Sequence, residues 1–371
     1  MLELYNIKSI YYAVKMNIDW NTMIEGNVLE ISGTVIPRGS VKDLKIELPK
    51  LYNLPASIPV HVVSGKRKGP TIFVSAAIHG DELNGIEIIR RLKKLSILKK
   101  IKGTLLLVPV VNVYGLSSLS RYLPDRRDLN RSFPGSTKGS LAARTAKIFF
   151  DEIVIKCNYG IDIHTGAIHR SNLPQIRTNI QNSETWELAK AFEAPVILHS
   201  EERDGSLRAV AQEKGVPILL YEAGEALRFD ETSIKIGVKG IVNVLKSLEM
   251  LPQTKKKRYR NPLTFKESSW TRATTSGMLR TVKGLGDLVE EGDIIAFIDE
   301  PIGGDSFELL SPFDGVIIGK IQIPLVQEGD AVFHIARSKD LDIAEERIEY
   351  FQESSLERSD IHGFHDEHSI E

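Results

Sequence analysis

The sequence predicts an α/β protein whose first part holds a mostly parallel or mixed sheet with helices on both faces, followed by a small C-terminal all-β domain. Two observations lead to this fold class. From residue 41 to residue 250, apolar strand-like runs alternate with amphipathic helix-like segments, whereas short strands with glycine turns follow after residue 251. Alternating strands and helices form a covered sheet, and short strands alone form a β domain. A chain of 371 residues is long enough for both.

The strands and helices of the first part differ in the spacing of their apolar residues. The run at residues 104–110 is almost continuously apolar, as expected for a strand that is buried on both faces. The segment at residues 81–95 instead carries apolar residues three or four positions apart. We expect strands at residues 60–63, 71–76, 104–110, 160–164, 195–199 and 217–221. We expect helices at residues 81–95, 141–155, 184–192 and 233–250.

The second part follows a polar, basic stretch, which we interpret as a linker because no second basic cluster supports a nucleic-acid site. Short strands are expected at residues 277–279, 293–298, 315–318 and 331–335. From residue 341 onward, ten Asp and Glu against two Arg predict a short helix and a disordered tail. The expected organisation is an N-terminal extension (1–25), a main domain (26–252), a linker (253–260), a β-sandwich or barrel-like domain (261–340) and an acidic tail (341–371).

Composition limits the class of protein. Apolar residues make up 42% and charged residues 26% of the chain, which is typical of a soluble globular protein. The net charge of −1 provides no overall field that recruits nucleic acid or an anionic membrane. The single cysteine, Cys157, excludes an intrachain disulfide and a cysteine-rich zinc site. The sequence has neither a signal-peptide pattern nor a long apolar run, so we expect a cytoplasmic protein. We expect it to bind neither nucleic acid nor a membrane. The sequence leaves open whether the chain forms a homo-oligomer.

A His and a Glu, three positions apart, follow the first buried strand of the main domain. Zinc accepts imidazole nitrogen and carboxylate oxygen, and two His with one Glu leave a fourth position open for water. The spacing of His79 and Glu82, between a strand and a helix, can aim both side chains at one point. Gly80 between them removes a side chain and permits unusual backbone angles. Alone, the pair is better explained as a surface His and a helix-capping acid.

Two further strands end in residues of matching chemistry. One ends at His164, with Asp162 two residues earlier as a candidate partner of its imidazole. Ligands collect at the carboxyl ends of parallel strands, so His79 and His164 are expected to face one crevice. The other strand is followed by Glu222, whose carboxylate suits a general base. The alternative for Glu222 is a capping or salt-bridged acid.

A loop between a strand and a helix, residues 121–135, is rich in arginine and bounded by Pro and Gly. Guanidinium groups bind carboxylates through two hydrogen bonds, and an adjacent Asn adds a further one. Substrate contacts tend to lie on such long loops. The loop is therefore a candidate for recognition of a carboxylate, against the ordinary alternative of a solvated surface loop.

With these segments in view, the chain resembles the succinylglutamate desuccinylase/aspartoacylase family, which is related to zinc carboxypeptidases. The resemblance runs from about residue 60 to residue 224, and a C-terminal β domain is also typical of the family. Residues 164–177 look more like the bacterial predicted-deacylase branch. The motifs, in this order, are His-Gly-Asp-Glu at 79–82, Asp-Leu-Asn-Arg-Ser-Phe-Pro-Gly at 128–135, Asp-Ile-His-Thr-Gly at 162–166 and Glu-Ala-Gly at 222–224.

The resemblance implies a zinc carboxypeptidase-like fold with one zinc ion per chain. By resemblance, His79, Glu82 and His164 are the zinc ligands and Glu222 is the general base. The implied activity is that of a zinc-dependent amidohydrolase, a deacylase that removes an acyl group from an N-acyl amino acid or related small carboxylate by metal-activated water. The alternatives are a zinc carboxypeptidase acting on short or modified peptides and a binding protein built on a degenerate hydrolase.

The resemblance also assigns polar side chains to the substrate. Asn130 and Arg131 would bind its carboxylate. An arginine upstream of this pair would polarise the scissile carbonyl; Arg121 is the first choice and Arg126 the second. Arg177 is a further candidate anion contact.

Overall fold

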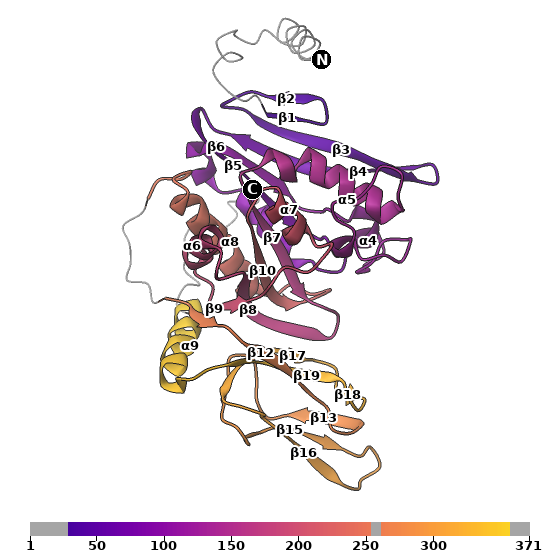
Figure 1. Ribbon diagram of the computed structural model, residues 1–371, viewed down its shortest axis with the longest axis vertical. Coiled ribbons are helices and arrows are strands. Elements are labelled where there is room, and N and C mark those ends of the chain that lie inside the picture. The colour runs from indigo at the N-terminus through magenta and orange to yellow at the C-terminus, as the bar shows by residue number, and fades with distance from the viewer. Residues whose placement is uncertain (1–28, 254–260, 357–371) are drawn as a thin grey trace, which may run out of the picture.

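The structure is a computed structural model that describes residues 29–253 and 261–356 (Figure 1). The expected N-terminal extension, the basic part of the linker and the end of the acidic tail lie outside the described residues. The strands are β1 (Leu29–Ile31), β2 (Thr34–Ile36), β3 (Val41–Leu51), β4 (Leu54–Ser64), β5 (Arg67–Ala76), β6 (Lys102–Val108), β7 (Tyr159–Gly166), β8 (Arg170–Thr178), β9 (Val196–His199), β10 (Ile218–Glu225), β11 (Leu263–Phe265), β12 (Ser268–Arg272), β13 (Gly277–Thr281), β14 (Leu288–Val289), β15 (Ile294–Asp299), β16 (Ser306–Leu310), β17 (Gly315–Ile321), β18 (Leu325–Val326) and β19 (Ala331–Arg337). The helices are α3 (Asn84–Lys93), α4 (Val113–Ser117), α5 (Leu141–Glu152), α6 (Ser183–Phe192), α7 (Leu207–Glu213), α8 (Glu231–Ser247) and α9 (Leu341–Leu356), with single 3₁₀ turns η1 (Ser96–Lys100), η2 (Leu129–Arg131) and η3 (Val154–Lys156).

Most strands belong to one large mixed sheet, with the order β12-β19-β17-β8-β10-β7-β5-β6-β4-β3. Its centre, from β6 through β5 and β7 to β10, is parallel, and β4 and β8 flank this centre in antiparallel pairing. In β6 every residue after Lys102 is buried, as expected for a strand covered on both faces. The predicted α/β class is confirmed, with the sheet in its mixed form.

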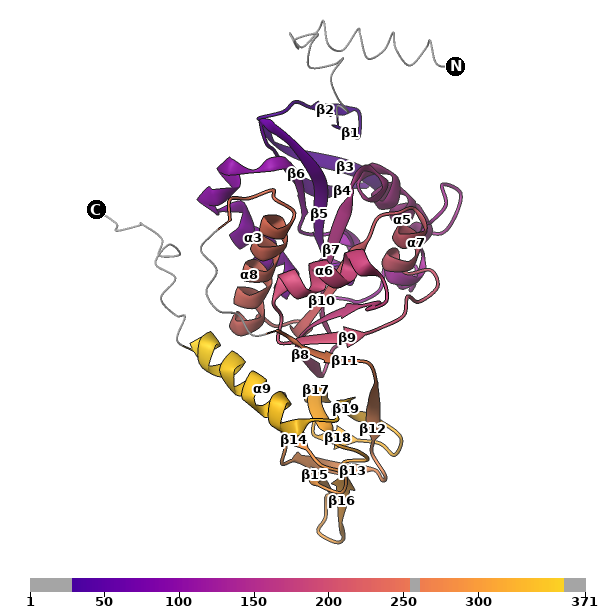
Figure 2. The same ribbon diagram turned by 60° about the vertical axis from the view of Figure 1, so that its left-hand side comes forward.

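Helices cover both faces of this sheet, and a hydrophobic core lies under each set. Along β5, Val74 belongs to the core beneath α3, α6 and α8, whereas its neighbour Phe73 belongs to the core beneath α5 and α7. Successive residues of a strand point to opposite faces, so the two cores lie on opposite sides of β5. In Figure 2 the central strands lie between α8 and α5.

The C-terminal region is rich in strands, as the sequence predicts, but part of it extends the large sheet. The first residues of β8 pair with β17, so that Gly319 lies opposite Asn172, and β19 and β12 follow. β11 and β14 also pair with the large sheet, whereas β13, β15, β16 and β18 form a separate four-stranded sheet over a third core. An unpaired strand edge can pair with another chain and lead to aggregation, and β17 covers the edge of β8 at the start of that strand. The expected domain boundaries stay predictions.

Several elements of the main part are absent from the sequence prediction: β1, β2 and β3, the short helix α4, and also β8 and α7. β8 contains Pro174 and the buried polar residues Asn172 and Gln175, and therefore lacks the apolar pattern of a strand. α7 has only seven residues, which is too short a segment for a repeated spacing of apolar residues to be recognised. The helix expected after residue 341 is α9. No helix among the described residues is long and apolar enough to cross a membrane.

Candidate metal and catalytic site

The candidate site lies where three neighbouring parallel strands end. His79 follows β5, His164 lies near the end of β7, and Glu222 lies in β10. β7 runs between the other two strands, and Glu222 is directly opposite His164 in the register of β10 and β7. Side chains in register on neighbouring strands point to the same face. The structure therefore brings the predicted strand ends together at one edge of the sheet.

His79, Glu82 and His164 form a buried cluster. Their donor atoms lie within 4.8 Å of one another, and each side chain is at most 4% exposed. Glu82 lies between the imidazoles, with Oε1 2.7 Å from His79 Nδ1 and Oε2 2.8 Å from His164 Nδ1. Two imidazoles and one carboxylate are a donor set that zinc accepts, so these residues fit the metal that the sequence predicts.

The charges in this cluster favour a bound cation. Burial alone would raise the pKa of the Glu82 carboxyl, but the charges of His79 and His164 outweigh burial and hold it well below its usual range. Burial alone would lower the pKa of His164, but Asp162 and Glu82 raise it. The carboxylates thus stabilise positive charge between them, and buried charges of this kind are balanced by a counter-charge or a metal ion.

Each imidazole also contacts a carboxylate through its second nitrogen. His164 Nε2 lies 2.7 Å from Asp162 Oδ2, and His79 Nε2 lies 3.1 Å from Asp128 Oδ1. Asp162 is held in turn by Ser75, whose hydroxyl donates to Oδ1 at 2.8 Å. Such carboxylates fix the tautomer and the orientation of metal-binding imidazoles. The sequence predicts the contact of Asp162 with His164. It does not predict the contact of Asp128 with His79, because the two residues lie 49 positions apart in the chain.

The turn that carries His79 and Glu82 has a constrained backbone. Ala77 adopts a φ of 52°, a region that residues with a Cβ rarely occupy. Gly80 packs against Gly115, where an added Cβ would lie 2.0 Å from the carbonyl carbon of Gly115. Gly80 is needed for this close approach and not for a left-handed backbone angle. Helix α3 accordingly starts only at Asn84, three residues later than the sequence predicts.

The structure separates the two candidate carbonyl-polarising arginines. Arg121 joins the cluster, with Nη1 3.3 Å from Glu82 Oε1 and Nη2 3.0 Å from Asp128 Oδ2. Arg126 is exposed, in a turn with φ of 63°. Arg121 is therefore the arginine positioned beside the candidate metal ligands.

Asn130 and Arg131 lie in η2, on the same loop. The Asn130 side-chain oxygen accepts a hydrogen bond from the backbone N–H of Leu207 at 2.9 Å, at the start of α7. This contact leaves the amide nitrogen of Asn130 as the group that can donate to a ligand. Arg131 is exposed, and its Nη1 donates to the carbonyl oxygen of Asn130 at 2.5 Å. The arrangement is compatible with the expected carboxylate contacts, which stay predictions.

Glu222 is half-buried and held by two donors from the neighbouring strand β8. Asn172 Nδ2 donates to Glu222 Oε2 at 2.6 Å, and Arg177 Nη1 lies 3.4 Å from Glu222 Oε1. The expected anion contact Arg177 thus faces a carboxylate of the protein itself. Asn172 was not singled out from the sequence, because the pairing of β8 with β10 is not visible there.

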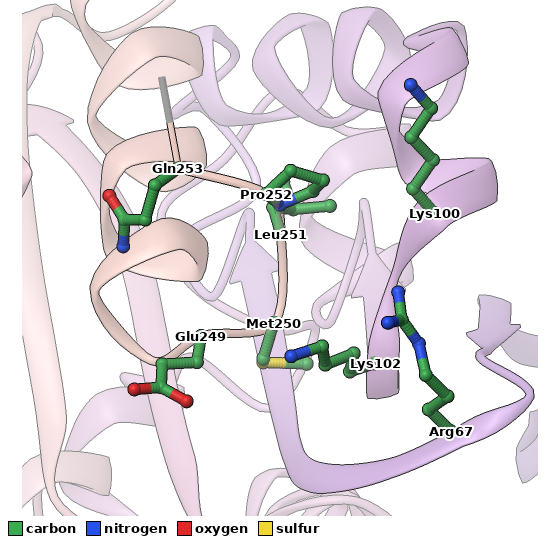
Figure 3. A pocket seen from close by; sticks show the side chains of 8 residues that line it. All are labelled: Arg67, Lys100, Lys102, Glu249, Met250, Leu251, Pro252 and Gln253. Atoms are coloured by element: carbon green, nitrogen blue, oxygen red, sulfur yellow. The ribbon is translucent and has the colours of Figure 1, made fainter. Parts of the chain in front are cut away.

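A separate cavity of about 330 Å³ lies at the opposite end of the strands (Figure 3). Arg67 at the start of β5, Lys102 at the start of β6 and Met250 after α8 line it. Because His79 follows the other end of β5, this cavity is not part of the candidate site.

Comparison with known proteins links this geometry to characterised relatives. The model of the succinylglutamate desuccinylase/aspartoacylase catalytic domain matches residues 68–248. The N-alpha-acetyl-L-2,4-diaminobutyric acid deacetylase of Halomonas elongata is 27% identical over 293 residues, which cover 75% of this chain and 85% of the relative.

Solved structures share the fold. A product-bound ectoine utilization protein from Ruegeria pomeroyi superposes with a TM-score of 0.74 at 23% identity, covering 85% of this chain and 100% of that one. A succinylglutamate desuccinylase/aspartoacylase from Rhodobacter sphaeroides superposes with a TM-score of 0.71 at 24% identity, covering 81% and 95%. At this identity the two structures show a common fold.

Proposed function

Because the chain belongs to the succinylglutamate desuccinylase/aspartoacylase family, we propose that it is a zinc-dependent deacylase that hydrolyses the amide bond of an N-acyl amino acid or related small carboxylate. The observation that carries the proposal is the buried cluster of His79, Glu82 and His164, with Glu222 in register beside His164. The Halomonas relative, named as a deacetylase of an acetylated amino acid, makes N-acetyl amino acids the first class to test.

We propose that His79, Glu82 and His164 hold one zinc ion per chain. A bound zinc ion would polarise the amide carbonyl and acidify a water molecule at the site. Asp162 and Asp128 keep the outer nitrogens of the two imidazoles occupied, so that both Nδ1 atoms face Glu82. The ligand atoms are thereby oriented before the metal binds.

The remaining polar groups move the proton and bind the substrate. Glu222 accepts the proton of the attacking water on its carboxylate and transfers it to the nitrogen of the leaving amine. Arg121 donates hydrogen bonds to the carbonyl oxygen as negative charge develops there. Asn130 and Arg131 bind the carboxylate of the amino acid, a task suited to an amide and a guanidinium on one loop. We also propose a cytoplasmic location, with which the single cysteine of the sequence, Cys157, is compatible, because a protein without disulfides needs no oxidising compartment.

A turnover screen tests this proposal. Zinc-loaded protein is assayed against N-acetyl and N-succinyl amino acids, with dipeptides as a second panel, and the released amine is quantified. We expect hydrolysis of at least one acylated amino acid. Faster hydrolysis of dipeptides would favour a carboxypeptidase, and no hydrolysis at full zinc occupancy would contradict the proposal.

The variant Glu222→Gln tests the general base. It is expected to keep its zinc while turnover falls by at least about a hundredfold, the usual scale of acid–base catalysis. Glu225→Gln is the matched control on the same strand, because Glu225 binds the backbone N–H of His169 outside the cluster. It is expected to retain most of the turnover. Native turnover of Glu222→Gln would remove the base assignment.

A further inference from the structure

We propose that Asn172 is the positioning residue of the catalytic base Glu222, and that the C-terminal strand region holds Asn172 in place through Gly319. This inference rests on the proposed function, because it takes Glu222 as the base. It assigns a role in the reaction to a residue of β8 and to a glycine of β17, neither of which is among the expected site residues.

The contact between Asn172 and Glu222 is short and sheltered. Asn172 is only 6% exposed, and its Nδ2 lies 2.6 Å from Glu222 Oε2. Arg177, from the same strand, lies near the other oxygen, with Nη1 3.4 Å from Glu222 Oε1. The two donors constrain the carboxylate plane, since a carboxylate held at both oxygens cannot rotate freely.

The backbone of β10 places Glu222 for this contact. In the pairing of β10 with β8, Glu222 lies opposite Gln175 and Gly224 lies opposite Asn172, with a register shift between the two pairs. Irregularities of this kind re-aim a side chain next to a functional site. Gly224 adopts a φ of 73°, a region that glycine occupies without strain.

Gly319 of β17 lies directly behind Asn172. The two residues are opposite each other in the pairing of β17 with β8. A Cβ added to Gly319 would lie 3.0 Å from Asn172 Oδ1 and 3.2 Å from the Cβ of His334, on the next strand β19. His334 itself is stacked on Trp270 at 4.8 Å and cannot readily retreat. The absence of a side chain at position 319 therefore leaves the space that the amide of Asn172 occupies.

These contacts form a continuous connection from the C-terminal region to the base. β19 supports β17, β17 borders Asn172 on β8, and Asn172 orients Glu222 on β10. The C-terminal region thus contributes to catalysis through the position of Asn172.

The first experiment compares Asn172→Asp and Asn172→Ala with the wild type. Both variants lose the donor; ionised Asp keeps the size of Asn but adds a negative charge beside Glu222, whereas Ala removes side-chain volume without adding a charge. A hydrogen bond to a charged group corresponds to about a 10- to 100-fold effect, and we expect kcat to fall by this factor in both variants. KM and zinc content are expected to stay near the wild-type values, because neither the metal ligands nor Asn130 and Arg131 are touched. Native kcat in Asn172→Asp would overturn the inference.

The second experiment is a double-mutant cycle with Glu222→Gln. If Asn172 acts through Glu222, Asn172→Ala causes no further loss of kcat in the Glu222→Gln background. A loss as large as in the wild-type background would mean a general structural role and would overturn the inference. The cycle also separates the two proposals. Native kcat of Glu222→Gln alone refutes the base and this inference together, whereas a large loss there with native kcat in Asn172→Asp refutes the inference only.

The third experiment tests the connection through the C-terminal region. Gly319→Ala is expected to displace the Asn172 amide and to lower kcat by about three- to tenfold, since small misplacements of catalytic groups are costly. Gly284→Ala is the matched control in the same region, because its added Cβ would meet no atom closer than 3.6 Å, from Asp287. We expect native kcat in this control. Native kcat in a folded Gly319→Ala protein would refute the connection through Gly319.

Discussion

The exchange of Asp128 for Asn tests whether the carboxylate that contacts His79 Nε2 stabilises the metal site. Asp128 Oδ1 lies 3.1 Å from His79 Nε2, and Oδ2 lies 3.0 Å from Arg121 Nη2. Burial alone would raise the pKa of Asp128, but the hydrogen bond with His79 and the charge of Arg121 hold it below its usual range. The group is therefore ionised at neutral pH. Asn keeps its shape and one oxygen but removes the charge.

The magnitude follows from the position of this carboxylate. Loss of a carboxylate partner of a metal-binding His typically weakens metal binding about 10- to 100-fold, or about 1.4 to 2.7 kcal/mol. The Asp128 side chain is 16% exposed, so solvent compensates little for the lost charge. We therefore expect zinc to bind about 30- to 100-fold more weakly. Because Arg121 also loses one of its two carboxylate partners, kcat is expected to fall in the zinc-saturated variant as well.

Zinc affinity is measured by competition with a chromophoric chelator at constant, near-neutral pH, and kcat is measured at saturating zinc. Asp125→Asn is the matched control in the same loop. Asp125 accepts a hydrogen bond from the backbone N–H of Ala142 at 2.9 Å, near the start of α5, so the control is expected to lower the melting temperature without changing zinc affinity. Zinc affinity of Asp128→Asn within about twofold of the wild type would refute the reasoning, as would an equal loss in the control.

Two further predictions address the metal set and the pH dependence of stability. His164→Ala removes one of three proposed ligands, so elemental analysis after dialysis is expected to find far less than one zinc per chain; unchanged zinc content would place the metal elsewhere. The hydrogen bond from Arg90 lowers the pKa of Glu87 to about 2, against burial and together with Arg91. A lowered pKa stabilises the fold above the unfolded-state pKa of 4.5, and this contribution is lost as pH falls toward about 2. Glu87→Gln is therefore expected to reduce the free energy of unfolding at pH 7 more than at about pH 3, and equal losses in denaturant titrations at both pH values would contradict this.

The strand ends of the candidate site were accessible to sequence reasoning because burial leaves a local pattern. The strands β5 and β10 contain apolar runs, β7 is apolar up to His164 except for Asp162, and a polar residue after such a run marks the end of a buried strand. His79, His164 and Glu222 stand at such ends. The strand β8 could not be recognised in the same way, because it buries polar side chains that are satisfied by contacts with distant residues.

The sequence by itself therefore determined the α/β class and the residue types at the strand ends, including the His-Glu-His set that resembles a zinc site. Only the tertiary structure decided which carboxylate contacts the outer nitrogen of each imidazole, which arginine lies beside the cluster, and which residues donate to Glu222. Asp128 contacts His79, which lies 49 positions away in the chain, and Asn172 contacts Glu222, which lies 50 positions away. The physical reason is that hydrophobic periodicity is a local property of the chain, whereas contacts between side chains on different strands and loops depend on sheet order and register, which the packing of the whole molecule sets.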